Sequence, residues 1–181
     1  MRRTLPLGST PLPALLDALR DRGVRTNAYF DALWPHVVVA DPPRALDVVI
    51  ATAAELGLPD GATLDALLAH AAPLGLGPCP LEAAARLRLA LDASPGRITV
   101  VSPRAFSDEA APRGFYLRDD DDGAWLRAFV ASDDWCFGAD ERFALGVVGP
   151  AAPHLRPHGS ADPGAPEPIS GPPGFAPRRF V

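Results

Sequence analysis

The segment from Asp47 to Leu91 constrains the fold more than any other part of this chain, because several independent local signals agree within it. Residues 58–61 (LPDG) form a turn sequence, and Thr63 is a good helix N-cap with Asp65 in the first helical turn. Apolar residues at helical spacing follow until Pro73 closes the helix. The segment predicts a scaffold, not a reaction.

The spacing of apolar residues indicates the structure of the segments on either side of this helix. Residues 75–80 (GLGPCP) form a stiff connection, after which Leu81–Leu91 predicts a helix that passes into an extended end. On the other side, the apolar run Leu46–Thr52 fits either a strand or the start of a helix that stops at Gly57. The length of this run is compatible with both a strand and the first turns of a helix.

The two ends of the ordered region differ in period. Near the N-terminus, apolar spacing predicts helices at Pro13–Arg22 and Asn27–Leu33 and a short strand or extended segment at His36–Ala40. The later part changes to strand-like runs, with Asp122-Gly123 as a hairpin-turn dipeptide and Ser132–Glu141 as a loop covering the sheet. The expected strands are 97–101, 114–118, 124–130 and 142–148.

These elements predict an α+β fold in which N-terminal helices pack on a small, mainly antiparallel C-terminal sheet. At 181 residues the chain is long enough for one domain with a core. We expect a flexible N-terminus over residues 1–12 and a single domain over 13–148. Residues 149–181 are rich in proline and glycine without an apolar period, which predicts a disordered or extended tail.

Charge and composition exclude several classes of function. All 17 basic residues are arginine, so lysine Schiff-base and P-loop chemistry are absent. A net charge of −5 argues against nucleic-acid binding, which needs a basic face. Two cysteines favour a reduced cytoplasmic setting over a disulfide framework. The sequence predicts no signal peptide and no membrane span.

Several sequence blocks resemble those of a group of small bacterial proteins of unknown function. The blocks are GLPDGATL (57–64), LGLGPCPLEAAARLRL (74–89), RITVV (97–101), GAWL (123–126) and DERFAL (140–145), and similar blocks occur in that group in the same order. The resemblance covers residues 46 to 148. It implies a shared fold, because its motifs are turns and core positions, and it carries over no catalytic residue.

Candidate chemical groups are few. The only set of residues that could assemble a metal site or a thiol nucleophile is Cys79 and Cys136 with His36 and His70, and no pair has ligand spacing. Cys79 looks exposed but rigid between two prolines, whereas Cys136 is expected to be buried. The acidic run 119–122 lacks the frame of a calcium loop and fits a solvated hairpin turn. We therefore expect no metal and no cofactor.

The helices at 63–72 and 81–88 also invite a helix-turn-helix interpretation. The second helix offers only Arg86 and Arg88 to base edges, so pairing with carboxylates or lining a pocket is the favoured role for both arginines. In the tail, Arg178, Arg179 and Phe180 are the best candidates for a specific contact, within a segment that can serve as a polyproline II ligand.

The function that fits these observations best is a cytoplasmic protein-binding or regulatory module with a protein partner. The alternative is a small enzyme or ligand-binding protein with a pocket near Cys79, Arg86 and Arg88, to which His70 also contributes. Partner recovery that depends on residues 149–181 would favour the first.

Overall fold

A computed structural model describes residues 1–149 of the chain. Within these residues one sheet of seven strands is interspersed with four short α-helices and two 3-10 turns. The elements are β1 (Arg2–Leu7), α1 (Leu12–Asp21), α2 (Ala28–Leu33), η1 (Trp34–His36), β2 (Arg44–Thr52), α3 (Leu64–Ala71), η2 (Ala72–Leu74), β3 (Leu76–Gly77), α4 (Glu82–Ala90), β4 (Ile98–Val100), β5 (Gly114–Asp120), β6 (Gly123–Phe129) and β7 (Arg142–Val147).

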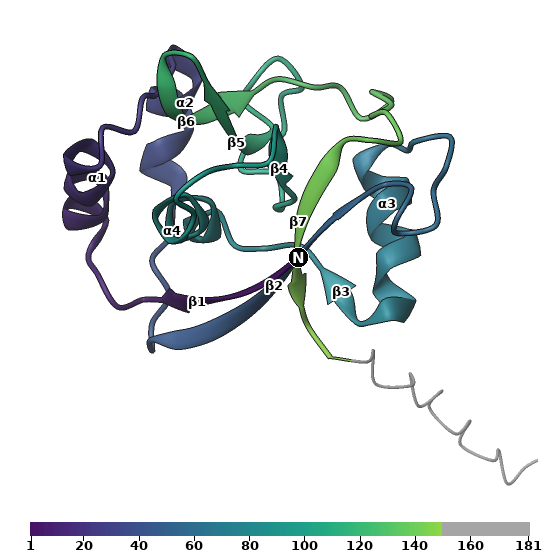
Figure 1. Ribbon diagram of the computed structural model, residues 1–181, viewed down its shortest axis with the longest axis horizontal. Helices are drawn as coiled ribbons and strands as arrows, with labels where there is room; N and C mark the ends of the chain where they lie inside the picture. Colours follow the sequence, from purple (N-terminus) through teal and green to yellow (C-terminus); the bar gives the residue numbers. More distant parts are fainter. Residues whose placement is uncertain (150–181) are drawn as a thin grey trace, which may run out of the picture.

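Strand β7 lies at the centre of the sheet, although it comes last in the chain. The strand order is β1-β2-β7-β4-β5-β6, with β3 also paired to β7. The β4–β7 pair is parallel and the other pairs are antiparallel, so the sheet is mixed. The sheet curls into a half-barrel around α4, with α1 and α2 at its open side and α3 beyond β7 (Figure 1).

Both faces of the curled sheet are buried, because alternate residues of the central strands belong to two separate apolar clusters. Val48 and Ile50 of β2 face the main core with α4, whereas Val49 and Ala51 face the second core with α3. On β7, Ala144 belongs to the main core and its neighbours Phe143 and Leu145 to the second. This alternation is the two-residue period of a strand with apolar cover on each side.

Small residues allow α4 to pack inside the curl. Ala83, Ala84 and Ala85 are all buried. The alanine run therefore contributes core packing at close range, which longer side chains would not fit without moving the helix.

The predicted arrangement of N-terminal helices on a C-terminal sheet is wrong. The strands β1 and β2 come from the first 52 residues, and β2 pairs directly with β7 over Val48–Thr52. Helices are interspersed along the chain instead of gathered at one end. The prediction failed because the pairing of β2 with β7 joins distant parts of the chain, which local periodicity does not encode. β1 is an edge strand, where Pro6 is tolerated because it lies outside a central ladder.

Local predictions fared better, with three differences. Thr63 caps α3 by accepting the Ala66 amide, and α4 passes into extended backbone at Leu91, both as predicted. Of the two alternatives for residues 36–40, the strand is absent, and Val37 has extended backbone angles. The hairpin turn consists of residues 121–122, with Gly123 already in β6. The segment expected to be a flexible N-terminus contains β1.

Candidate functional site

A buried ionic network joins α4 to two distant loops. The Glu82 carboxylate is fully buried; its Oε1 accepts the Gly8 amide and its Oε2 the Ala40 amide, each at 2.9 Å. Arg86, one turn later, donates from Nε to Glu82 at 2.9 Å and from Nη1 to Thr10 Oγ1 at 3.0 Å. Glu82 and Arg86 therefore hold the start of the chain and the loop after η1 against the helix.

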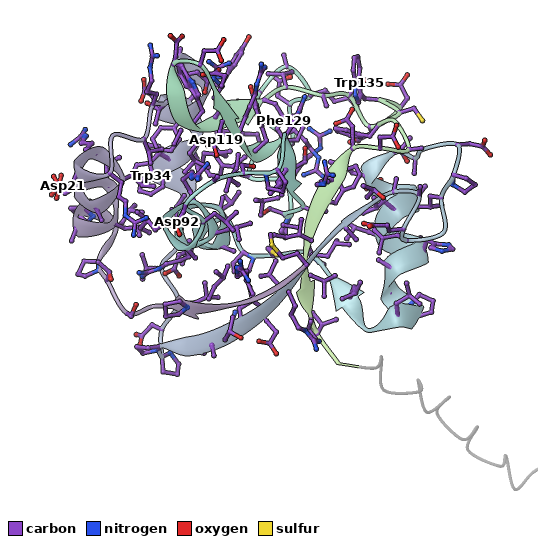
Figure 2. The ribbon with its side chains drawn as sticks, viewed as in Figure 1. Asp21, Trp34, Asp92, Asp119, Phe129 and Trp135 are labelled. Atoms are coloured by element: carbon purple, nitrogen blue, oxygen red, sulfur yellow. The ribbon has the colours of Figure 1, made fainter. Side chains whose placement is uncertain are left out.

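Arg88 has a similar internal role on the opposite side of α4. It is 2% exposed and donates to Asp119 Oδ1 at 2.6 Å and to the Leu91 carbonyl at 2.9 Å. The second oxygen of Asp119 accepts the Ser94 amide. Figure 2 shows Asp119 beside α4, where the carboxylate joins the helix end to β5. Both arginines thus pair with carboxylates, as the sequence suggested, and their contacts are internal.

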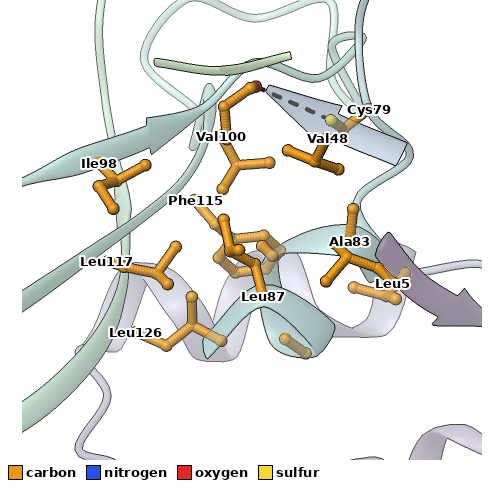
Figure 3. Close-up of a cluster of buried hydrophobic side chains, with 14 of the residues drawn as sticks. Leu5, Val48, Cys79, Ala83, Leu87, Ile98, Val100, Phe115, Leu117 and Leu126 are labelled. Carbon is orange, nitrogen blue, oxygen red and sulfur yellow. Dashed lines mark hydrogen bonds between the residues drawn. The ribbon is translucent and has the colours of Figure 1, made fainter. Parts of the chain in front are cut away.

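The two cysteines are placed opposite to expectation. Cys79 is fully buried in the main core beside Val48 and Val100, and its thiol donates to the Ala144 carbonyl at 3.8 Å (Figure 3). Cys136 is exposed. The correction follows from the backbone: the Cys79 amide bonds to the Val101 carbonyl, which draws the proline-flanked turn inward against β4 and β7. Burial raises the pKa of the Cys79 thiol to about 12, so Cys79 is a packing residue and not a nucleophile.

Thiol labelling of the native chain should therefore modify one cysteine only. At pH 8 we expect Cys136 to react with a colorimetric disulfide reagent within minutes, whereas Cys79 reacts only after unfolding in urea. The released chromophore measures the number of thiols in each state. A Cys136→Ser variant that still releases one equivalent rapidly would contradict the assignment.

The remaining predicted site residues do not converge. His70 is exposed on α3, which packs on the other side of the sheet from Cys79. Within residues 1–149 no group of three or more His, Cys, Asp or Glu residues is arranged to hold a metal ion. Arg178, Arg179 and Phe180 lie outside the described residues. The pocket predicted near Cys79, Arg86 and Arg88 gains no support, because those three side chains are buried in internal contacts.

A hollow at the β5–β6 end of the sheet is the best candidate for a functional site. It has a volume of about 370 Å³ and is lined by Asn27, Tyr29, Arg97, Tyr116, Ala128, Phe129, Val130, Ala131, Trp135 and Phe137. A second hollow of about 350 Å³ shares Arg97 and continues along residues 138–142. We call the two together the Arg97 groove. Figure 2 shows Phe129 and Trp135 at the same end of the molecule, with Trp135 projecting outward.

Backbone contacts fix the walls of the Arg97 groove. Asn27 caps α2 by accepting the Phe30 amide and also bonds to both backbone groups of Ala128, so the helix that carries Tyr29 is anchored to β6. On the other wall, Ala62 and Phe137 exchange two backbone hydrogen bonds, at 2.9 and 3.0 Å. This bridge positions the loop that presents Trp135.

An aromatic column forms the floor. The column consists of four rings in which each ring meets the next edge to face, with neighbouring centroids 5.5 to 6.2 Å apart: Tyr116, Phe129, Phe137 and Phe143. The Arg97 guanidinium lies 4.3 Å from the Tyr116 centroid and 5.5 Å from that of Phe129. Such a column is rigid and apolar, and the cation above it retains free hydrogen-bond donors.

Arg97 has no carboxylate and no hydrogen-bond acceptor among residues 1–149, in contrast to Arg86 and Arg88. A guanidinium held on aromatic faces with its N–H groups free can bind a carboxylate in bidentate fashion. One feature of the sequence pointed towards this site, namely the bulk of Trp135 and Phe137 in a loop. Nothing in it indicated that Arg97 and Tyr29 would join them.

Comparison of the chain with protein-family models, with curated proteins and with solved structures finds no match. The resemblance of residues 46–148 to small bacterial proteins therefore stays a prediction. In the described part of the chain, no helix has the length and apolar character needed to cross a bilayer.

Proposed function

We propose that this protein is a protein-binding module that holds an extended segment of a protein partner in the Arg97 groove. One observation carries the proposal. Seven large apolar side chains are exposed among residues 1–149, and three of them, Tyr29, Val130 and Trp135, line this one hollow. Isolated exposed apolar residues are ordinary, whereas a cluster around a hollow is typical of a binding surface.

The chemistry of the groove favours recognition over catalysis. The 370 Å³ hollow is lined by no thiol, imidazole or carboxylate, the groups that would serve as nucleophile or general base, and the adjoining hollow adds the carboxylates of Asp140 and Glu141 but no thiol or imidazole. Aromatic walls with an adjacent cation suit a ligand that offers stiff apolar surface and a carboxylate. Proline-rich segments fit aromatic grooves because their extended helix loses little entropy on binding.

The setting that we propose is the cytoplasm. Cys79 and Cys136 are both free thiols, which is compatible with a reducing compartment. The net charge of −5 disfavours binding to nucleic acids and to anionic membrane surfaces, so a protein partner is the proposal that fits best.

Peptide binding by the full chain tests this function. The probe is an array of ten-residue peptides that combine prolines three residues apart with a single glutamate. We expect Trp135→Ala to weaken the best binder at least about tenfold, because a central aromatic anchor typically carries 2 kcal/mol or more of binding energy. Arg97→Ala should weaken only those peptides that contain the glutamate. Fluorescence anisotropy of labelled peptides measures both effects.

Val38→Ala is the matched control, since Val38 is also an exposed apolar residue but lines a different hollow beside His36. Its affinity for the same peptides should equal that of the unaltered chain. Equal binding by the Trp135→Ala and Val38→Ala variants would reject the Arg97 groove as the binding surface, and an array without any binder would reject the peptide-binding function.

A further inference from the structure

The groove has a candidate occupant within the same chain. We propose that residues 162–168 (DPGAPEP) bind the Arg97 groove in cis, so that the protein regulates access to its own binding surface. This inference rests on the proposed function and names the regulation of that site.

Composition provides the first reason. Nine of the 22 prolines of the chain fall in its last 32 residues. Pro163 and Pro166 are three residues apart, which is one turn of a polyproline II helix, so the two rings would lie on one face of that helix. The groove offers Tyr29, Trp135 and the Tyr116 face as aromatic surfaces for such a pair of rings.

The acidic residues of segment 162–168 make it a better partner for Arg97 than the rest of the C-terminal region. Asp162 and Glu167 are the only acidic side chains after residue 149, and Glu167 follows Pro166 directly. Neither Arg97 nor Arg142, the two arginines of the groove, forms an ion pair among residues 1–149, and of the two Arg97 is the one that lines the aromatic hollow. The other proline cluster, at 172–177, precedes Arg178 and Arg179, which Arg97 would repel. Glu167 is therefore the complementary partner for Arg97.

Chain length permits the contact. The Phe137 ring packs on Phe143 near the start of β7, at 5.5 Å between centroids, whereas the chain leaves the sheet after the other end of β7 at Val147. The six residues of β7 span about 20 Å, and two strand spacings to β5 add about 10 Å. The 13 residues from Gly149 to Asp162 reach about 40 Å in polyproline II conformation, which is sufficient.

Tethering makes even a weak contact effective. A short linker gives an effective concentration of about 1 mM, so an intrinsic Kd near 0.1 mM would leave about nine-tenths of the molecules closed. A partner segment would then bind with an apparent affinity about tenfold weaker than to the open groove.

A charge-reversal cycle in the full chain tests the contact. Trp34 and Trp125 are each only 8% exposed, so acrylamide quenching of fluorescence reports mainly on Trp135, which is 57% exposed in residues 1–149. We expect Glu167→Arg and Arg97→Glu each to raise the quenching constant roughly twofold or more, because each opens a mostly closed groove. The double variant should return to the original value. Arg156→Glu, a reversal outside the segment, is the control and should change nothing.

Binding in trans separates the failure of this inference from failure of the proposed function. A synthetic peptide of residues 160–170 should bind the Glu167→Arg chain about tenfold more tightly than the unaltered chain. Equal affinity and equal quenching for the two chains would overturn the cis contact, while array peptides that still bind both would leave the proposed function intact. Failure of the array and of the 160–170 peptide to bind the opened chain would overturn both.

Dilution distinguishes a contact within one chain from one between copies. An intramolecular contact gives the same quenching at about 1 μM as at about 100 μM, because its effective concentration is set by the linker. Quenching that increases on dilution would show that the segment binds a second copy, and the cis proposal would fall.

Discussion

Replacement of Glu82 by alanine should lower the free energy of unfolding by about 3–5 kcal/mol, the range found when one partner of a buried ion pair is removed. The substitution leaves the Arg86 guanidinium, 7% exposed, without its carboxylate, and also deprives the amides of Gly8 and Ala40 of their acceptor. Urea unfolding followed by circular dichroism measures the change.

Two variants calibrate this result. Asp17→Ala removes a carboxylate from an ion pair with Arg20 in which both side chains are 67% exposed, and it should cost less than about 1 kcal/mol. Glu82→Gln keeps one acceptor oxygen, which can serve the Gly8 amide or the Ala40 amide but not both, and it should cost less than Glu82→Ala. If Glu82→Ala were no more harmful than Asp17→Ala, the network would not be what holds the two loops to α4.

Replacement of Gly61 by alanine should destabilise the fold by about 3 kcal/mol, combining left-handed backbone strain with the loss of bridge hydrogen bonds. Gly61 has a φ of +81°, and a Cβ there would lie 2.1 Å from the Phe137 carbonyl oxygen. That oxygen accepts the Ala62 amide, so the loop must shift away. Because Phe137 lines the Arg97 groove, peptide affinity should fall together with the free energy of unfolding.

Gly23→Ala is the control for Gly61→Ala. Gly23 has a similar φ of +67° but no atom within 4 Å of the position that a Cβ would take. It should therefore show only the strain of a left-handed residue, about 1–2 kcal/mol, and leave peptide affinity unchanged. Thermal unfolding measures the stability lost by each variant: Gly23→Ala reports backbone strain alone, and Gly61→Ala reports strain plus the clash with the Phe137 carbonyl. Equal losses of stability would show that the Phe137 loop moves away without an energetic cost.

Local sequence signals predicted much of the secondary structure because they act over a few residues. The Thr63 cap and the strands β4 to β7 follow from neighbours in the chain. The arrangement of the sheet did not follow, because the pairing of β2 with β7 joins residues about 90 positions apart, and no local period encodes that choice. The prediction of separate helical and sheet halves failed at this step.

The Arg97 groove could not be predicted from the sequence, because its residues are also far apart in the chain. Arg97 directly precedes β4, Tyr116 lies in β5 and Trp135 lies in a loop, so the three meet only through tertiary packing. Reactive residue types were poor indicators of the site, since Cys79, Arg86 and Arg88 are chemically versatile but buried. An arginine such as Arg97 is available to bind a ligand when the fold places no internal carboxylate beside it. Whether a carboxylate lies nearby depends on the tertiary structure and not on neighbours in the sequence.

The central place of β7 also fixes when this protein can fold during its synthesis. β2 ends at Thr52 and its partner strand begins only at Arg142, so the ribosome adds about 90 residues between them, a delay on the order of 10 s at ordinary elongation rates. Until β7 is synthesised, β2 lacks its neighbour on that side, and so does β4 once residues 98–100 have been added. The unpaired edges and apolar faces of both strands can then bind other nascent chains. The protein should therefore need protection by chaperones until β7 has been synthesised.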